Sequence, residues 1–429
     1  MKPLADYNLF DDATRECPFP YFQAIRREAP VYYMPEIGAW YVSRYEDLRH
    51  VKKNPQIFSN QIYAFADSRG GTRDVAESYR SEHGWQRVHT LQRTDPPEHT
   101  RYRKLINHAF SVKRIRGMTA YVETIVNDLV DGFIQRGECD FVREFSVPLP
   151  CTVIADQLGV PRERIGDLKK WSDAMLAPGG GYIDEAEALE CGKLVVQAQR
   201  FFAGIIEERR RQPRDDIISD VVHATIADKE TGEERHLTMH ELLDLLDQLL
   251  TGGNETTTNA IASGLMLLLQ RPGTMERLHG DEKLLRNFIE ETLRYESPVI
   301  HLWRVTTQDT ELGGVKLPKG SSLALGYASA NRDEAVFEDG ETFDIERSKI
   351  GAHLAFGSGP HHCPGAALAR QEMFSTFTVL LNRLDNIRLK DPADRFEHLP
   401  SSFLRGLKEL QITFDVRNAG RHEPGASWY

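Results

Sequence analysis

The sequence is poor in cysteine: five occur in 429 residues, and no two are spaced as a CxxC pair. That excludes a disulfide scaffold and a cysteine-based zinc site. Glycine (32) and proline (21) are too sparse for a collagen-like or low-complexity chain. No apolar run reaches the roughly 18 residues of a transmembrane helix, and the N-terminus lacks the apolar segment of a signal peptide. We therefore expect a cytoplasmic protein that does not enter a membrane.

Positive charge is also in short supply, with 53 Lys and Arg against 64 Asp and Glu, a net charge of −11. This balance argues against a dedicated nucleic-acid binder. Hydrophobic residues make up 40% and charged residues 27%, an ordinary globular composition without internal repeats. The sequence predicts one large domain over residues 1–429, mainly α with a minor β portion.

Apolar spacing predicts where the secondary structure lies. Between residues 44 and 290 helical periodicity dominates, whereas short strand-like runs precede and follow that region. Residues 177–181, Ala-Pro-Gly-Gly-Gly, are rich in glycine and proline and predict a loop. Residues 60–92 predict a longer loop. The expected helices cover 20–28, 115–135, 194–211, 239–270, 281–295 and 365–384; the expected strands lie at 31–33, 39–42, 315–320 and 322–325. The helix at 239–270 is long enough to cross the whole molecule.

One cysteine has unusual neighbours: Cys363 lies in Phe356-Gly-Ser-Gly-Pro-His-His-Cys-Pro-Gly365, just before an amphipathic helix. A thiol at a helix start is exposed to the positive end of the helix dipole, which favours a thiolate. A thiolate acts as a nucleophile or as a metal ligand. The alternative is a glycine-rich loop with an incidental buried cysteine, and Cys363 alone does not separate these possibilities.

The complete segment resembles the haem-binding loop of the cytochrome P-450 family, Phe-Gly-x-Gly-x-His-x-Cys-x-Gly, and matches every fixed position. The resemblance implies the cytochrome P-450 fold, with one large domain and a long central helix over haem b. It implies that Cys363 is the thiolate ligand of the iron and that His361 reaches a haem propionate. Gly357, with Gly359, would let backbone amides approach the sulfur.

Further family motifs lie at the expected distances from this loop. Glu291 and Arg294 form the Glu-x-x-Arg motif, and with Arg347 they would make the buried triad that locks the cysteine loop. His99, Arg103 and Arg304 match the family's propionate-binding cations.

The middle of the long helix, Thr251-Gly-Gly-Asn-Glu-Thr-Thr257, resembles the oxygen-activating segment of the family. The resemblance makes Glu255 and Thr256 the catalytic acid–alcohol pair, and the glycine pair permits a helical bulge. Close helix packing is the alternative explanation of the glycines. The substrate pocket would contain Gln248, Thr251, Gly252, Ile300, Leu302 and Phe403. Gln248 and Thr251 hint at a substrate with a hydrogen-bonding group, unless Gln248 instead caps a neighbouring loop.

The family resemblance implies a monooxygenase that inserts one atom of dioxygen into a small hydrophobic substrate. Its glycine-rich oxygen segment is similar to that of members acting on steroids, terpenoids and lipid-like compounds. Electrons would come from NAD(P)H through a separate ferredoxin-type donor and its reductase, and the enzyme would be a monomer. A peroxide-driven peroxygenase and a non-catalytic haem sensor are the rivals, and the Glu255-Thr256 pair argues against both.

Overall fold

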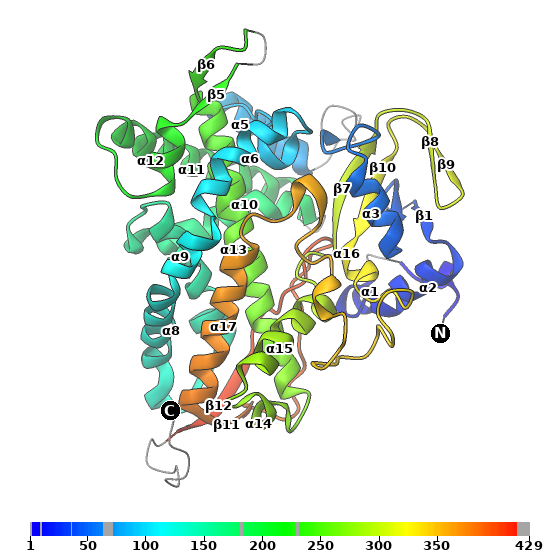
Figure 1. Ribbon diagram of the computed structural model, residues 1–429, viewed down its shortest axis with the longest axis vertical. Coiled ribbons are helices and arrows are strands. Elements are labelled where there is room, and N and C mark those ends of the chain that lie inside the picture. Colours follow the sequence, from blue (N-terminus) through cyan, green and yellow to red (C-terminus); the bar gives the residue numbers. More distant parts are fainter. Residues whose placement is uncertain are drawn as a thin grey trace.

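The computed structural model describes residues 2–8, 11–35, 37–62, 72–180, 183–228 and 231–417. Helices dominate these residues and gather on one side of the molecule, while most strands lie on the other side (Figure 1). The helices are α1 (Asp12–Glu16), α2 (Phe19–Glu28), α3 (Tyr45–Lys53), α5 (Thr72–His83), α6 (Glu98–Ala109), α7 (Val112–Gly117), α8 (Thr119–Phe133), α9 (Pro148–Gln157), α10 (Ile165–Gly180), α11 (Glu185–Arg211), α12 (Ile217–His223), α13 (Met239–Leu269), α14 (Thr274–Leu278), α15 (Glu282–Glu296), α16 (Tyr327–Ala330) and α17 (Ala366–Arg383).

The long helix α13 runs through the middle of the molecule, as its apolar pattern predicts (Figure 1). Thr238 and Glu241 form a reciprocal capping box at its start, which satisfies backbone N–H groups of the first turn. It packs against α9, α10, α15 and α17. At Gly264 a Cβ would lie 2.5 Å from the Phe377 ring, so only glycine allows α17 to approach this closely. This contact fixes α17, which begins directly after the cysteine loop, against the central helix.

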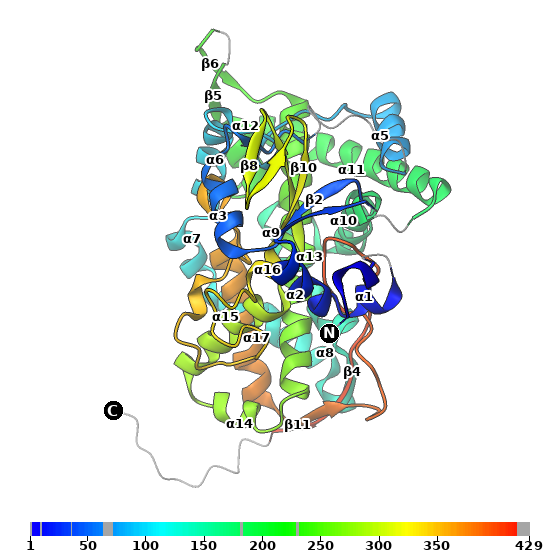
Figure 2. The ribbon, with the colours of Figure 1, turned by 90° about the vertical axis from the view of Figure 1, so that its right-hand side faces the viewer.

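The strands form small sheets, the largest with the order β1-β2-β10-β7-β3. The strands are β1 (Val31–Met34), β2 (Ala39–Val42), β3 (Phe58–Ser59), β4 (Glu138–Asp140), β5 (Thr225–Ala227), β6 (Glu234–His236), β7 (His301–Thr306), β8 (Thr310–Leu312), β9 (Val315–Leu317), β10 (Ser322–Gly326), β11 (Leu384–Leu389) and β12 (Gln411–Val416). The predicted first hairpin is confirmed, since β1 and β2 pair antiparallel with Tyr32 opposite Tyr41. Strands β11 and β12 lie at the far end of α17 (Figure 2).

Two predicted loops are wrong in part. Residues 177–180 complete α10 instead of forming a loop, because packing against α11 and α13 outweighs the poor helix propensity of Pro178. A Cβ at Gly179 would lie 3.6 Å from the Phe403 ring, an ordinary van der Waals distance, so this contact does not require glycine. The predicted 60–92 loop contains α5, while residues 63–71, and residue 181 of the other predicted loop, lie outside the described residues.

The predicted 115–135 helix is likewise divided. The chain bends at Met118, so α7 ends at Gly117 and α8 runs from Thr119 to Phe133.

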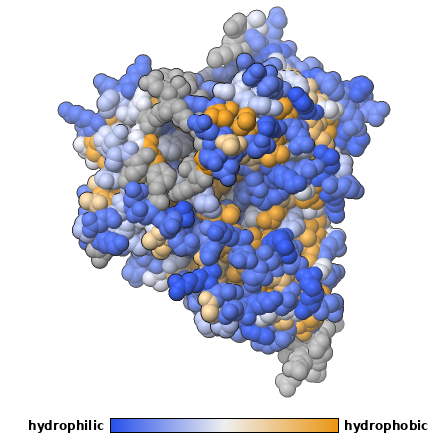
Figure 3. All heavy atoms as spheres, turned by 180° about the vertical axis from the view of Figure 1, so that it is seen from behind, coloured by the Kyte–Doolittle hydropathy of each residue, from blue (hydrophilic) through white to orange (hydrophobic). Residues whose placement is uncertain are grey.

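The surface is mainly hydrophilic on the face opposite to that of Figure 1, with apolar residues scattered in small groups (Figure 3). Among the described residues, no helix combines the length and apolar character needed to cross a membrane.

Candidate active site

The cysteine loop closes on itself and ends at the start of α17. The backbone N–H of Cys363 donates to the carbonyl of Phe356 across 2.9 Å. Burial raises the pKa of the Cys363 thiol, and hydrogen bonds from the backbone N–H groups of Gly365 and Ala366 lower it. These donors belong to the first turn of α17, so the helix start supports negative charge on the sulfur.

The glycines of the loop adopt a backbone conformation that other residues rarely adopt. Gly357 and Gly359 adopt positive φ angles of 68° and 67°, which an L side chain rarely tolerates. The amides that hydrogen-bond to the sulfur come from residues 365 and 366. Gly357 and Gly359 therefore shape the turn, and the expectation that they let backbone amides approach the sulfur stays a prediction.

Basic side chains converge beside this loop, and the described residues provide no matching set of carboxylates. The rings of His99 and His361 lie 4.0 Å apart, and Nε2 of His361 is buried with no hydrogen-bond partner in the part of the chain that the structure describes. Burial and neighbouring positive charges lower the pKa of His361 to about 2 and that of His99 to about 4. Buried Arg304 donates to the Trp303 carbonyl across 2.6 Å, and Arg103 donates to the His362 carbonyl across 2.5 Å.

A group of donors that includes buried His99 and Arg304 is stabilised when an anion completes it. Within the described part of the chain, none of these four side chains forms an ion pair with a carboxylate. Two adjacent carboxylates, such as the propionates of haem, would supply the missing charge. The donor set therefore fits haem, with Cys363 beside it as a soft thiolate ligand.

The predicted triad forms, but it holds a different segment. Arg294 makes a bidentate ion pair with Glu291 at 2.7 Å, and Arg347 reaches the same carboxylate at 3.2 Å. All three side chains are buried. The remaining donors of the arginines bind carbonyls of residues 331–342, not of the cysteine loop. The only link to the loop in this network runs through Asn331, which accepts from the backbone N–H of Leu354, among the residues that the structure describes.

A second ion cluster holds the cysteine loop directly, and the sequence reasoning missed it. Glu290 on α15 pairs with Arg370 on α17 through 2.5 and 2.9 Å contacts and with His353 at 3.0 Å. Burial alone would raise the pKa of Glu290, but the hydrogen bonds from Arg370 and His353 lower it to about 2. Because His353 precedes the loop and Arg370 follows it, one carboxylate fixes both ends. Its position beside the Glu-x-x-Arg motif was the available signal.

The Glu290→Gln variant is expected to lower the free energy of unfolding by about 1–3 kcal/mol, since charge-assisted hydrogen bonds are lost. The folded pKa lies below the ordinary value of 4.5, so the contribution is complete above that pH and is lost as pH falls toward 2. Urea titrations at neutral pH and near pH 4 measure the difference, which should narrow on acidification. Glu282→Gln, at an exposed ion pair of the same helix, is the control with about 0.5 kcal/mol or less. Equal effects of the two variants would contradict the assignment.

Gly252 and Thr256, in the middle of α13, lie on a side of the helix where Gly252 has no close neighbour. A Cβ at Gly252 would meet no atom within 4 Å, and the Thr256 hydroxyl donates to the Gly252 carbonyl across 2.9 Å. The helix remains α-helical through both residues, so the predicted bulge is absent from this described segment. At Gly253, in contrast, a Cβ would touch Ile154 at 3.3 Å. One glycine thus leaves a free surface, and the other serves helix packing.

Glu255 lies at the inner end of a row of ionisable groups. Its carboxylate pairs with Lys169 on α10 at 3.1 Å, and Lys169 in turn contacts Asp173. Side-chain exposure rises along this row, from 7% at Glu255 through 26% to 51% at Asp173. Burial raises the pKa of Glu255 to about 7, although Lys169 opposes the shift. The row can carry protons between solvent and the interior at neutral pH.

Gln248 and Thr251 use their polar groups within the protein. The Gln248 amide accepts from the backbone N–H of Gln92 at 2.9 Å and donates to Thr90 and Asp244 at 2.8 Å. These contacts match the loop-capping alternative for Gln248. The Thr251 hydroxyl donates to the Asp247 carbonyl at 2.8 Å. Their polarity is therefore no evidence for a hydrogen-bonding group on the substrate.

The remaining predicted pocket residues separate into two groups. Ile300 packs in the apolar cluster of α2 and β10 with Phe22 and Ala324, and its assignment to the pocket stays a prediction. Its backbone N–H still donates to the Phe403 carbonyl across 2.8 Å. Leu302 is 39% exposed, and it shares a face of β7 with Arg304 two residues later. Leu302 therefore points toward the cation cluster.

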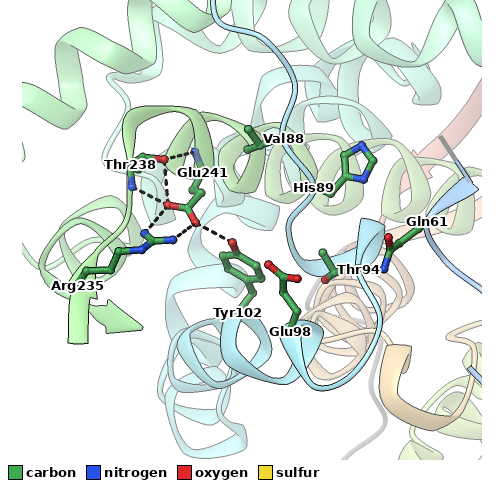
Figure 4. A pocket seen from close by; sticks show the side chains of 9 residues that line it. All are labelled: Gln61, Val88, His89, Thr94, Glu98, Tyr102, Arg235, Thr238 and Glu241. Atoms are coloured by element: carbon green, nitrogen blue, oxygen red, sulfur yellow. Dashed lines mark hydrogen bonds and ion pairs between the residues drawn. The ribbon is translucent and has the colours of Figure 1, made fainter. Parts of the chain in front are cut away.

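A surface cleft of about 440 Å³ lies between α6 and the start of α13 (Figure 4). Its centre is polar: Arg235 pairs with Glu241 at 2.8 Å, and Tyr102 donates to the same carboxylate. The lining residues are Gln61, Val88, His89, Thr94, Glu98, Tyr102, Arg235, Thr238 and Glu241. Gln61, Val88 and His89 belong to the 60–92 segment that was expected to border the substrate pocket, and the other six residues were not predicted to contact substrate or cofactor. The ion pair secures the α13 capping box, which gives it a structural role.

Comparison with known proteins agrees with this geometry. Residues 189–414 match the family model described as Cytochrome P450. The chain is 33% identical to a steroid C26-monooxygenase of Mycobacterium tuberculosis, covering 96% of both sequences. It is 32% identical to linalool 8-monooxygenase of Pseudomonas putida, over 93% of this chain and 96% of that one. The structure of CYP109E1 from Bacillus megaterium in complex with testosterone superposes with a TM-score of 0.79 at 34% identity, covering 94% of this chain and 99% of that one. The chain belongs to the cytochrome P450 family and is a haem-thiolate monooxygenase that receives electrons from NAD(P)H through partner proteins.

Proposed function

We propose that Cys363 is the thiolate ligand of the haem iron, and that His99, Arg103, Arg304 and His361 bind the haem propionates. The observation that carries this proposal is a cluster of basic side chains, with His99 and Arg304 buried, that forms no ion pair with a carboxylate among the described residues and lies next to a sulfur that accepts hydrogen bonds at a helix start. When bound, haem supplies the activation of dioxygen, with a thiolate that favours cleavage of the O–O bond. The chain's own residues orient this group, exclude water and handle protons.

Thr256 and Glu255 would have different roles in proton delivery. Thr256 faces the open space at Gly252, where its hydroxyl can hydrogen-bond to dioxygen or a water molecule. Glu255 would renew protons from solvent through Lys169 and Asp173. A peroxygenase or a haem sensor would not need such a supply, which supports the monooxygenase.

We propose a steroid- or terpenoid-like substrate. Two observations support it: the apolar side chain of Leu302 lies on the same face of β7 as Arg304, and the relatives are named for such substrates. The predicted monomeric state, single domain and cytoplasmic location, and the ferredoxin-type identity of the electron donor, stay predictions. Size-exclusion chromatography and reduction by purified ferredoxins test two of them directly.

A screen of steroids, terpenoids, fatty acids and aromatic acids should show a saturable low-spin to high-spin change of the Soret band with the first two classes. Leu302→Asp should weaken that binding about tenfold, because an apolar contact of about 1.5 kcal/mol or more is lost. Leu399→Asp is the matched control, since Leu399 is equally exposed (41%). Tightest binding of fatty acids would contradict the substrate class. If Leu302→Asp and Leu399→Asp change substrate affinity equally, then Leu302 does not contact the substrate.

A further inference from the structure

Lys52, at the end of α3, is a buried lysine that the family resemblance does not explain. Its side chain is 5% exposed, whereas the next residue, Lys53, is exposed. The other buried residues of α3 include Leu48 and Val51, so Lys52 extends from the core-facing side of the helix. Burial lowers the pKa of its ammonium group well below the ordinary value. An ammonium group in this position needs an anion or a dense set of hydrogen-bond acceptors.

The contacts of Lys52 supply neither. Its Nζ lies 3.2 Å from the Tyr327 hydroxyl and 5.7 Å from the centre of the same ring. No carboxylate pairs with it among the described residues. The other close neighbour is the cysteine loop: a Cβ at Gly357 would lie 3.4 Å from Nζ, and one at Gly359 would lie 3.0 Å from the Lys52 carbonyl. Glycine at these two positions thus leaves room for Lys52.

The charged neighbours of Lys52 have the same sign. Arg304 lowers the pKa of Lys52, and Lys52 contributes to the lowered pKa of His361 and of His99. Asp95 is the carboxylate that acts on this cluster, but it already accepts from the Ser59 hydroxyl at 2.5 Å and from the Asn60 N–H at 2.9 Å. The group therefore has one more uncompensated cation than the sequence predicted.

We propose that Lys52 is a further propionate-binding residue, which approaches the haem from α3, whereas His99 and Arg103 approach from α6. The inference rests on the proposed haem site and adds a residue to it. An ammonium group is a point charge with three donors, so it can complete a carboxylate that the planar guanidinium of Arg304 binds from another side. Lys52 thereby strengthens haem retention and raises the potential for reducing the iron, because positive charge favours the reduced state.

The test compares Lys52→Met with Lys53→Met, its exposed neighbour, in the haem-loaded enzyme. The rate of haem loss to excess apomyoglobin should rise about tenfold in Lys52→Met and stay unchanged in Lys53→Met. The same enzymes loaded with haem dimethyl ester, whose propionates carry no charge, should lose it at equal rates. The reduction potential of Lys52→Met should fall with haem, because a positive charge is removed. Lys52→Arg, which keeps the charge, should retain the preference for haem over the ester.

Two results would overturn the inference alone. Faster loss of haem and ester alike in Lys52→Met means that Lys52 only fills space, and unchanged haem loss means that it does not bind the propionates. If Lys52→Met does not fold, loss of the haem preference in Lys52→Arg overturns it as well. Failure of the proposed function is distinct, because the wild-type protein would then hold haem and its ester equally weakly.

Discussion

Replacement of Cys363 by histidine is expected to abolish the red-shifted Soret band of the ferrous–carbon monoxide complex, from which the family takes its name. The sulfur lies at the first turn of α17, where two backbone N–H groups support a thiolate, and imidazole cannot supply an equivalent charge. Monooxygenase turnover should fall by several orders of magnitude, while haem can remain bound through the cation cluster. Difference spectra of freshly purified protein provide the measurement.

The control for this variant is Cys17→Ser, because Cys17 is an exposed thiol far along the chain from the loop. It should leave both the spectrum and the turnover unchanged. A wild-type protein that binds haem but lacks the red-shifted band would show that Cys363 is not the ligand.

Thr256→Ala and Glu255→Gln are expected to fail in different ways. Loss of the Thr256 hydroxyl leaves substrate binding intact but diverts most electrons from product to hydrogen peroxide. Glu255→Gln should lower kcat by about 10²-fold, because a proton-supplying acid is lost. Since the pKa of Glu255 is about 7, wild-type kcat should decline as pH rises through neutrality and the acid loses its proton. The Gln variant should show no such dependence.

Product formed per NAD(P)H consumed, with peroxide assayed in parallel from about pH 6 to 8, separates the two effects. Thr124→Ala on α8 is the matched control, because Thr124 makes the same bond to the carbonyl four residues earlier, at 2.9 Å. If both test variants form product at the normal rate and with the normal yield per NAD(P)H, then Glu255 and Thr256 serve only helix packing.

Local features of the sequence predicted most of the fold. The capped 31-residue α13, the β1–β2 hairpin and the helix after Cys363 all follow from periodicity and turn chemistry between near neighbours. The exception at 177–180 shows packing overriding propensity, because α11 and α13 hold those residues in a helix.

The parts of the site that lie within one sequence motif could be predicted. The contacts between residues that are far apart in the sequence could not. Cys363 and the Glu291 triad lie within recognisable strings of sequence. The role of Gln248 depends on Gln92, 156 positions away, and Glu290 meets Arg370 across 80 positions. The burial of Lys52 likewise depends on a glycine turn more than three hundred residues later. Sequence spacing does not encode such contacts.

The clamp of Glu290 on His353 and Arg370 has a consequence for the entropy of cofactor binding. Bringing together the two ends of a flexible segment costs entropy, and that cost falls on whichever step orders the segment. Because α15 already holds both ends of the cysteine loop, the loop is closed when the polypeptide folds. The conformational entropy of the Cys363 side chain and its loop is therefore already reduced before haem binds. Haem binding does not have to order the loop, so the binding free energy of haem is not reduced by that cost. Removing this carboxylate should therefore make haem association slower and entropically less favourable, even at temperatures where the protein stays folded.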